Sequence, residues 1–307
     1  MEKTVKVKKK KSMLNRRSKS ETIVMAIAFV IMLIHVCAIL YVFFYGVNLS
    51  LKWSQASFKD PAKRNALSIL FDREKGIFEP RFENYIFAFT QLEEIGTPFL
   101  SLVFNSIWYS IGGTLLALTV AACSTYVVAK YKNAFTRFVF NLVIFLMIFP
   151  VIGAGPSLYK LYTVLHFNQT PLILLSGLNN MCNLMMYAFF SALPWTYAEA
   201  AFIDGANDFQ VFWKIMLPMA LPSISVLFVT QVITMWNDYT TPLVYLSKSF
   251  PTLSVALYQY DHDAQYLNLN YPVFFAGVTL SMIPPILLFS VMQNTIMSKV
   301  YFGGLKG

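Results

Sequence analysis

A short stretch between two apolar runs of the 307-residue chain combines acidic, alanine, glycine and aromatic residues at spacings suited to contact with another protein. The residues of this pattern are Glu199, Ala200, Ala201, Asp204, Gly205 and Phe209, followed by Ile215, Leu217 and Pro218. Small alanines beside an acid allow close approach by a partner's groove, and Gly205 permits a backbone turn that a residue with a Cβ resists. The stretch 195–222 therefore predicts two short helices, joined at a glycine, that lie at the membrane surface and dock a partner protein.

The ends of these two helices are expected at specific residues. Thr196 is placed to cap the first helix, with Glu199 three residues on as its capping-box partner. Pro218 and Pro222 are expected to limit how the chain re-enters the membrane. The alternative is an amphipathic helix that lies on lipid, but such helices usually carry Lys and Arg on their polar face, and this one is acidic.

Polar and aromatic residues inside other apolar runs are candidates for a solute path, because lipid cannot satisfy their polar groups. They are Asn179, Asn180, Asn183, Gln231, Trp236, Asn237 and Asp238. Amides beside an aromatic ring suit sugar hydroxyls, which need hydrogen-bond donors and acceptors plus a flat apolar face. The alternative is hydrogen bonding between helices, and Asp238 could also lie at the outer interface rather than in the bilayer.

Little else in the chain has the spacing of a catalytic, metal or nucleotide site. The triplet Asp261-His262-Asp263 could bind a cation or form a solvated loop that contacts another protein. His35 has no companion at metal-ligand spacing. The cysteines, which all lie in apolar runs, are Cys37, Cys123 and Cys182. The sequence contains no Gly-x-x-x-x-Gly-Lys-Ser/Thr pattern, so the chain is not expected to bind ATP itself.

The composition indicates what kind of molecule must position these residues. Hydrophobic residues make up 57% of the chain, charged residues only 13%, and the mean hydropathy is +0.56, so lipid must solvate most of it. The net charge of +9 does not indicate nucleic-acid binding, because nine of the 24 Lys and Arg residues lie within the first 20 residues. A basic tail directly before an apolar run is typical of a cytoplasmic anchor near anionic lipid.

Six apolar segments meet or approach the length of about 20 residues that a membrane helix needs. They are residues 22–46, 101–129, 136–162, 171–193, 221–246 and 272–297. Phe149-Pro150 and the glycines after it should break the third segment, and Pro284-Pro285 should bend the sixth. We therefore predict an all-α membrane protein with a basic tail at 1–21, a six-helix domain at 22–300 and a short tail at 301–307.

The basic residues predict the orientation of these spans, since cytoplasmic loops carry an excess of Lys and Arg. The segment between the second and third spans holds Lys130, Lys132 and Arg137 without an acid, whereas the next one holds only Lys160. We therefore expect both termini in the cytoplasm and the long segment 47–100 outside. The same topology puts the acidic stretch between the fourth and fifth spans in the cytoplasm.

The spacing Glu-Ala-Ala, three residues, Gly, nine residues, Ile-x-Leu-Pro, which runs from Glu199 to Pro218, resembles the EAA loop of binding-protein-dependent ABC importers. In that family the loop belongs to the membrane-spanning (permease) subunits. Phe104-Asn105-Ser106, Trp236-Asn237-Asp238-Tyr239 with Pro242-Leu243, and Gly304-Leu305-Lys306-Gly307 are similar to its sugar-importer branch, which includes the smaller membrane subunit of the maltose importer. The resemblance covers about residues 20–307.

This resemblance implies a mechanism and a set of partners. The loop would form a coupling helix that sits in a cleft of an ATP-hydrolysing subunit and carries its movement into the membrane. The implied partners are a second permease subunit, two ATPase subunits and an extracellular solute-binding protein. ATP and Mg would be held by the ATPase subunits, with no cofactor on this chain. The chain would then be a non-enzymatic, multi-pass subunit in the plasma membrane that imports a carbohydrate.

Two other functions are compatible with parts of the sequence. An ABC permease could carry a non-sugar solute, although an anion would favour Arg or Lys inside the spans, which contain almost none away from their ends. An ion-coupled secondary transporter often has internal repeats and buried acids, but no clear repeat is visible and Asp238 is the only acid near mid-span. A membrane enzyme has no support from clustered Ser/His/Asp, Cys/His or His-metal residues.

Overall fold

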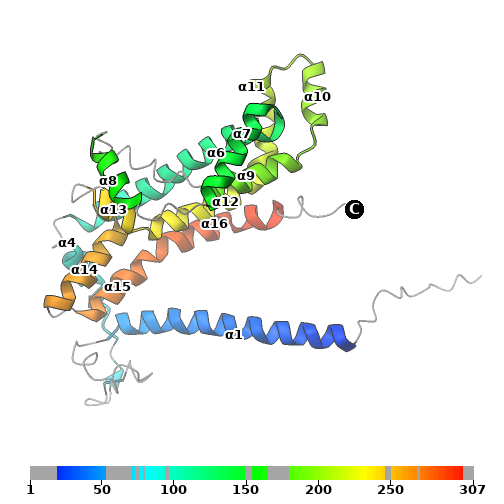
Figure 1. Ribbon diagram of the computed structural model, residues 1–307. Helices are drawn as coiled ribbons and strands as arrows, with labels where there is room; N and C mark the ends of the chain where they lie inside the picture. Colours follow the sequence, from blue (N-terminus) through cyan, green and yellow to red (C-terminus); the bar gives the residue numbers. More distant parts are fainter. Residues whose placement is uncertain are drawn as a thin grey trace, which may run out of the picture.

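The computed structural model describes residues 19–52, 71–72, 77–78, 80–93, 97–148, 154–164, 180–245, 250–267 and 270–299 of the chain. Apart from one pair of two-residue strands, the regular structure in these ranges is helical (Figure 1). Four helical rods are long and apolar enough to cross a membrane: Glu21–Ser50, Phe99–Lys130, Asp208–Asn237 and Tyr271–Asn294. The all-helical membrane fold is thus confirmed for the described residues, whereas six complete spans stay a prediction.

The elements follow the chain in the order of their labels (Figure 1). The first part contains α1 (Lys19–Ser50), the antiparallel strands β1 (Phe71–Asp72) and β2 (Ile77–Phe78), and α4 (Glu83–Glu93). A long rod follows, made of α5 (Phe99–Ile107), the π-helical turn η3 (Trp108–Gly112) and α6 (Gly113–Lys130). After it come α7 (Ala134–Ile148), α8 (Ala154–Val164) and α9 (Asn180–Ala192). The short α10 (Thr196–Ile203) is followed by a rod of α11 (Asp208–Val211), the π-helical turn η5 (Phe212–Met216) and α12 (Leu217–Asn237). The last helices are α13 (Thr240–Tyr245), α14 (Leu253–Leu267), α15 (Tyr271–Ser281) and α16 (Ile283–Lys299).

The centre of the molecule is the packing of α6 against α9 and α12, with α16 against α12. Ala121 and Ala122 on α6 are buried in this contact, and small side chains there let the helix backbones approach closely. Met186 and Phe190 of α9 are fully buried against them. Thr125 donates its hydroxyl to the Ala121 carbonyl at 2.6 Å, so this buried polar group is satisfied within its own helix.

Helix α1 lies apart from this centre along most of its length (Figure 1). Every side chain from Glu21 to Phe44 is exposed, and the helix meets the rest of the molecule at α15. Because α1 is apolar on all sides, only lipid or another membrane protein can cover it. His35 and Cys37 lie on this exposed surface. Within the described ranges, no group of three or more His, Cys, Asp or Glu side chains is arranged to hold a metal ion.

The predicted boundaries agree with the structure for the first two spans and differ for the fifth. The first two predicted spans, 22–46 and 101–129, lie within rods that extend a few residues further at each end. The fifth was predicted over 221–246, but its rod begins at Asp208 and ends at Asn237. The prediction that Pro218 and Pro222 limit the entry of this helix was therefore wrong. Pro218 directly follows the first residue of α12, just after the π-helical turn η5, and Pro222 lies inside α12, so the rod continues through both prolines.

The third, fourth and sixth predicted spans are each interrupted or partly outside the described ranges. The third is divided into α7 and α8, and the proposed break around Pro150 lies outside the described residues. The fourth is described only from Asn180 onward. The bend predicted for the sixth span is confirmed, because α15 ends at Ser281 and α16 begins at Ile283, directly before Pro284-Pro285. The predicted tail 301–307 and residues 1–18 of the predicted tail 1–21 lie outside the described residues, while residues 19–21 already belong to α1.

A buried amide joins the end of α1 to α4. Asn84 donates its Nδ2 hydrogens to the carbonyl oxygens of Ser50 and Lys52, each at 2.8 Å. The hydroxyls of Ser50 and Tyr85 form a second hydrogen bond across the same junction, at 2.7 Å. The side chains of Asn84 and Lys52 are both buried, and burial lowers the pKa of the Lys52 ammonium group. This junction fixes the direction in which α1 leaves the bundle.

Replacing Asn84 with Ala should lower the free energy of unfolding by roughly 2 kcal/mol, because two buried carbonyls lose their donor. Denaturant unfolding of the detergent-solubilised protein measures this loss. The matched control is Thr90→Ala on the same helix, since the exposed Thr90 hydroxyl bonds only to the Phe87 carbonyl and should contribute less than about 0.5 kcal/mol. Equal losses for the two variants would show that the junction does not stabilise the fold.

Candidate functional site

Helix α10 ends in a turn that only glycine adopts without strain. Gly205 has φ of +83°, and the added Cβ of any other residue would be strained there although no atom lies within 4 Å of it. Its amide donates to the Phe202 carbonyl at 3.0 Å, and the next amide, of Ala206, donates to the Ala201 carbonyl at 2.9 Å. These two bonds form a Schellman motif with glycine in the left-handed position. The predicted glycine turn after a short helix is confirmed.

The start of α10 differs from the expectation. Thr196 is the first residue of the helix rather than its cap, and no side chain caps this end. Trp195 precedes it with helical backbone angles, so the Thr196 hydroxyl is not positioned to receive a backbone amide. The reciprocal capping box lies instead at α11: Asn207 Oδ1 accepts from the Gln210 amide at 2.9 Å, and Gln210 Oε1 accepts from the Asn207 amide at 3.0 Å.

One side of this helical hairpin is exposed and combines acids with apolar side chains. We define this docking surface by its exposed residues Glu199, Ala200, Ile203, Asp204, Gly205 and Phe209. Ile203 is 85% exposed and Phe209 is 70% exposed, at the end of the molecule where α10 and α11 project (Figure 1). Large exposed apolar side chains beside acids at such a tip are typical of a protein contact. The sequence placed Ile203 in the helix predicted to dock without singling it out, and its high exposure is what the structure adds.

The opposite side of the hairpin is buried and fixes it on the bundle. Ala198 and Ala201 are buried, so the two alanines of the Glu-Ala-Ala sequence face different ways, with Ala200 exposed and Ala201 inside. Ile215 and Leu217 are partly buried against the same apolar cluster, and Pro218 is exposed. The sequence-predicted residues thus divide into a docking group and an anchoring group.

The end of α6 contacts both ends of the hairpin. The Tyr131 phenol donates to the Asp208 carboxylate, and its ring meets the Trp195 ring edge-on at 6.0 Å. Lys130 donates from Nζ to the Leu193 carbonyl at 2.6 Å. Burial, and then the bond to Asp208, raise the pKa of the Tyr131 phenol, so it stays protonated and donating at neutral pH. We call Lys130 and Tyr131 the α6 clamp.

Three of the proposed solute-path residues make contacts between helices. Gln231 is buried on α12 and its Oε1 accepts from the Cys182 thiol at 3.5 Å. Trp236 donates from Nε1 to the Ser281 carbonyl at 3.1 Å. Asp238 directly follows α12, and its Oδ2 accepts from the Tyr109 hydroxyl at 2.8 Å. These bonds favour the second interpretation made from the sequence, in which the polar groups join helices.

The asparagines proposed for the same path are less tied to their surroundings. Asn237 is exposed at the last turn of α12, where its amide donates to the Ile233 carbonyl at 2.9 Å. Asn183 is half-buried on α9. Asn179 and the side chain of Asn180 lie outside the described residues.

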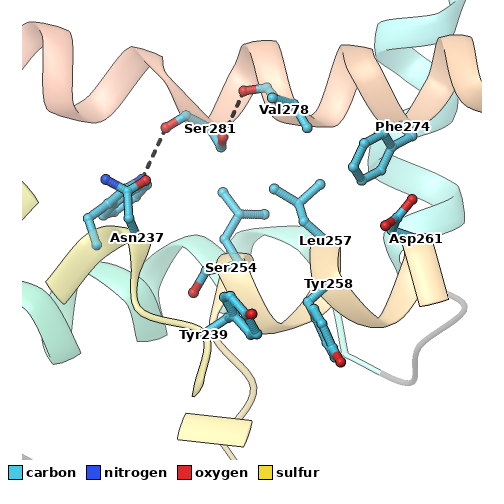
Figure 2. Close-up of a pocket in the computed structure, with 11 residues that line it drawn as sticks. Asn237, Tyr239, Ser254, Leu257, Tyr258, Asp261, Phe274, Val278 and Ser281 are labelled. Carbon is cyan, nitrogen blue, oxygen red and sulfur yellow. Dashed lines mark hydrogen bonds between the residues drawn. The ribbon is translucent and has the colours of Figure 1, made fainter. Parts of the chain in front are cut away.

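A pocket of about 330 Å³ lies where the end of α12 meets α14 and α15 (Figure 2). Its walls are formed by Trp236, Asn237, Tyr239, Leu253, Ser254, Leu257, Tyr258, Asp261, Phe274, Val278 and Ser281. The pocket is at the end of α12 opposite to the docking surface (Figure 1). Sequence reasoning proposed Trp236 and Asn237 for a solute path, and it placed Asp261 in a loop that could bind a cation or contact a protein, whereas Asp261 lies in helix α14. Tyr258 and Asp261, three residues apart on one helix face, were the available signal.

A helical membrane bundle with an exposed acidic and apolar hairpin at one end and a pocket at the other fits the class of membrane transport subunits. Residues 113–300 match the family of inner membrane components of binding-protein-dependent transport systems, and the chain belongs to this family. It is 29% identical over 230 residues to a diacetylchitobiose uptake system permease protein of Streptomyces coelicolor, covering 73% of this chain and 74% of that protein. It is also 29% identical over 257 residues to an arabinooligosaccharides transport system permease protein of Halalkalibacterium halodurans, covering 82% and 88%.

The fold of a solved transporter agrees with this assignment. A bacterial ABC transporter involved in the import of the acidic polysaccharide alginate has a chain that matches with a TM-score of 0.69 and 22% sequence identity, covering 91% of this chain and 98% of that one. At this identity the likeness shows a shared fold.

Family membership confirms the resemblance drawn from the Glu199 to Pro218 spacing. The chain is a permease subunit of an ABC importer, which makes it a transport component and not itself an enzyme. It is a multi-pass protein of the plasma membrane, and importers of this family in general combine a partner permease, ATPase and a solute-binding protein. The alternative of an ion-coupled secondary transporter was wrong.

Tyr131→Phe should loosen the hairpin, because it removes the hydroxyl that binds Asp208 and keeps the ring that packs on Trp195. The lost bond should cost about 1 kcal/mol. A spin label on Ile203, which is 85% exposed, should report faster motion by electron paramagnetic resonance in permease freed of its ATPase subunits. The control Tyr197→Phe alters an exposed tyrosine of α10 and should leave the spectrum unchanged. Identical spectra for both variants would show that the hydrogen bond from Tyr131 to Asp208 does not restrain the hairpin.

Proposed function

We propose that this chain forms, with a second permease subunit, the translocation path of an importer for a carbohydrate. An extracellular solute-binding protein delivers the sugar, and two separate ATPase subunits supply the energy and hold ATP and Mg. The sugar assignment rests on relatives named for diacetylchitobiose and arabinooligosaccharides. The single observation that supports coupling to an ATPase is the exposed docking surface beyond a glycine-terminated α10.

In this proposal α10 enters a cleft of an ATPase subunit. Glu199 and Asp204 supply charge for basic groups on that subunit, and Ile203 and Phe209 supply apolar contact. Movement of α10 reaches the membrane by two routes. One is the α6 clamp, and the other is the unbroken rod Asp208–Asn237, which starts three residues after Gly205. The anchoring residues keep the hairpin from moving independently of the bundle.

The same proposal fixes the domain limits and the orientation. Residues 1–21 form a basic cytoplasmic tail, 22–300 a six-span transmembrane domain with its EAA loop at 195–222, and 301–307 a cytoplasmic tail. The docking surface and the Asn133 turn are cytoplasmic, because the ATPase subunits act there, and both termini lie on that side. Helices α4 and α14, at the other end of the molecule, are extracellular (Figure 1).

The solute path is proposed along α9 and the outer half of α12. Asn179, Asn180, Asn183 and Asn237 are the candidates for contact with a passing sugar. Gln231, Trp236 and Asp238 belong to the same region and, through their interhelical bonds, hold the shape of the path. A buried side chain that already has a partner is a weaker candidate for direct binding, because the solute would have to replace that bond.

The coupling role is tested at Gly205. Gly205→Ala should weaken ATPase docking and lower binding-protein-stimulated ATP hydrolysis and uptake together, because a Cβ at positive φ costs about 1–2 kcal/mol, a factor of roughly 5–30. Gly205→Asn should retain more activity, since asparagine tolerates this conformation better. Gly46→Ala is the control, because that glycine is helical and also has no atom within 4 Å of an added Cβ. Equal activity of Gly205→Ala and Gly46→Ala would refute the coupling role.

Orientation is tested by labelling single cysteines in a background where Cys37, Cys123 and Cys182 are replaced. A membrane-impermeant thiol reagent added outside cells should modify a cysteine at Thr90, which is exposed on α4. It should not modify one at Asn133 or Asn207 until the membrane is permeabilised. External modification at Asn207 would reverse the topology and separate the docking surface from the ATPase.

A further inference from the structure

We propose that the pocket between α12, α14 and α15 is a carbohydrate subsite within this subunit, selective for a neutral rather than an acidic sugar. The proposal rests on the proposed function and adds a binding site and a charge class to it. Four features of the pocket carry it: the aromatic rings, the free hydrogen-bond acceptors, the charge of the walls and the position in the molecule.

The first feature is a stack of three rings, two of which, Tyr239 and Tyr258, line the pocket. The Tyr239 and Tyr258 rings are 4.6 Å apart and 14° from parallel, and the His262 ring continues the stack at 5.9 Å and 6°. Tyr239 is 41% exposed and Tyr258 is 38% exposed, so neither ring is sealed into the protein. Stacking covers the faces between these rings and leaves ring edges and the two tyrosine hydroxyls for a ligand, which suit the C–H groups and the hydroxyls of a sugar.

The second feature is which polar groups are free. Ser281 is already used, because its carbonyl accepts from Trp236 and its hydroxyl donates to the Val278 carbonyl (Figure 2). Ser254 likewise donates to the Asp238 carbonyl at 3.0 Å. By contrast, Asp261 has no hydrogen bond or ion pair among the described residues, and Figure 2 shows its carboxylate beside Phe274 at the pocket edge. Free carboxylate oxygens need donors, and the hydroxyls of a sugar supply them.

The third feature is the charge of the walls. Asp261 is the one ionisable acid among the eleven lining residues, and none of them is Lys or Arg. An acidic sugar would bring its carboxylate into a partly enclosed space that holds a like charge and no cation. Its binding would therefore be penalised, whereas a neutral sugar would not be. The pocket can discriminate by charge without any contact that is specific for one sugar.

The fourth feature is place and size. The pocket opens at the end of α12 opposite to the docking surface, which is the side where the binding protein delivers its solute in the proposed function (Figure 1). Its volume of about 330 Å³ is at the lower end of the range for small-molecule sites, about 300–1,000 Å³. It therefore has room for one end of a short carbohydrate near the entrance of the solute path, and not for a long chain.

The test uses a cysteine inside the pocket as a local reporter. Ser254→Cys is made in the complete transporter with Cys37 and Cys123 replaced, since both are exposed, and the transporter is placed in nanodiscs without binding protein or ATP. A thiol reagent modifies the pocket cysteine at a measured rate. The probes are trehalose, arabinotriose and diacetylchitobiose as neutral sugars, and a short oligomannuronate as the acidic one. A bound neutral probe at ten times its Kd should slow modification about tenfold, and the acidic probe should not.

Substitutions at Tyr258 and Asp261 test whether these residues of the pocket wall bind the sugar. Tyr258→Ala and Asp261→Asn should each abolish most of the protection by the neutral probe, and Asp261→Lys should create protection by the oligomannuronate. That gain of binding cannot come from misfolding. Tyr159→Ala, which removes an exposed tyrosine of α8, should leave protection unchanged. The inference is overturned if no neutral probe protects, if the acidic probe protects equally, or if Tyr258→Ala and Asp261→Asn are protected like the parent.

Failure of this inference can be told apart from failure of the proposed function. If binding-protein-stimulated ATP hydrolysis and sugar uptake are normal while the pocket cysteine is never protected, the importer function stands and the subsite is wrong. If Tyr258→Ala and Asp261→Asn instead weaken docking of the binding protein and leave protection unchanged, the pocket is a protein contact and the subsite is again wrong. If the parent transporter shows neither stimulated hydrolysis nor uptake with any binding protein, the proposed function fails.

Discussion

Every backbone amide and carbonyl that lies in a bilayer must find its hydrogen-bond partner within the protein. This constraint explains why the described ranges are almost wholly helical, and why serines and threonines on the rods donate back to carbonyls of their own helix, as Thr125 and Ser110 do. It also limits where the chain can be irregular. The turn at Gly205 lies beyond the apolar rods, and at the break after Asn237 the Asp238 carboxylate accepts from the Tyr109 hydroxyl and from the Thr241 amide.

The same constraint makes α12 a mechanical link. Because α12 is one continuous helix after η5, a displacement at its Leu217 end is transmitted to its Asn237 end. The Leu217 end follows η5 and α11, where the Asp208 carboxylate accepts from Tyr131 of the α6 clamp, and the other end forms one wall of the pocket through Trp236 and Asn237. In the proposed function, a movement imposed on α10 and α11 would change the relation of α12 to α15 at the pocket, where the Trp236 to Ser281 bond joins the two helices. Helix stiffness and the hydrogen bonds at each end would then connect the docking surface to the end where the solute enters.

The sequence predicted features whose cause is local and missed those that depend on packing between distant segments. The turn at Gly205 was predictable because glycine by its own type favours a positive φ, whatever packs around it. The capping of α10 was mispredicted because Trp195 already has helical angles, which follow from its packing on Tyr131 and Lys130 rather than from its own type. The partners of Gln231 and Asp238 lie 49 and 129 residues away, so no spacing rule could name them.

The two π-helical turns lie next to opposite ends of α12. η5 joins the hairpin to α12 at Leu217, and η3, on the neighbouring rod, packs against α12 near its outer end. A π-helical turn holds one residue more than an α-helical turn, and such turns inside helices are frequent at functional sites. Tyr109, whose hydroxyl binds Asp238, belongs to η3 itself. A shift of η3 would therefore release or retain Asp238 at the pocket end of α12, while a shift of η5 would change the angle between docking surface and rod. The stiffness of α12 transmits movement, and the two π-helical turns are the places where that movement can begin and end.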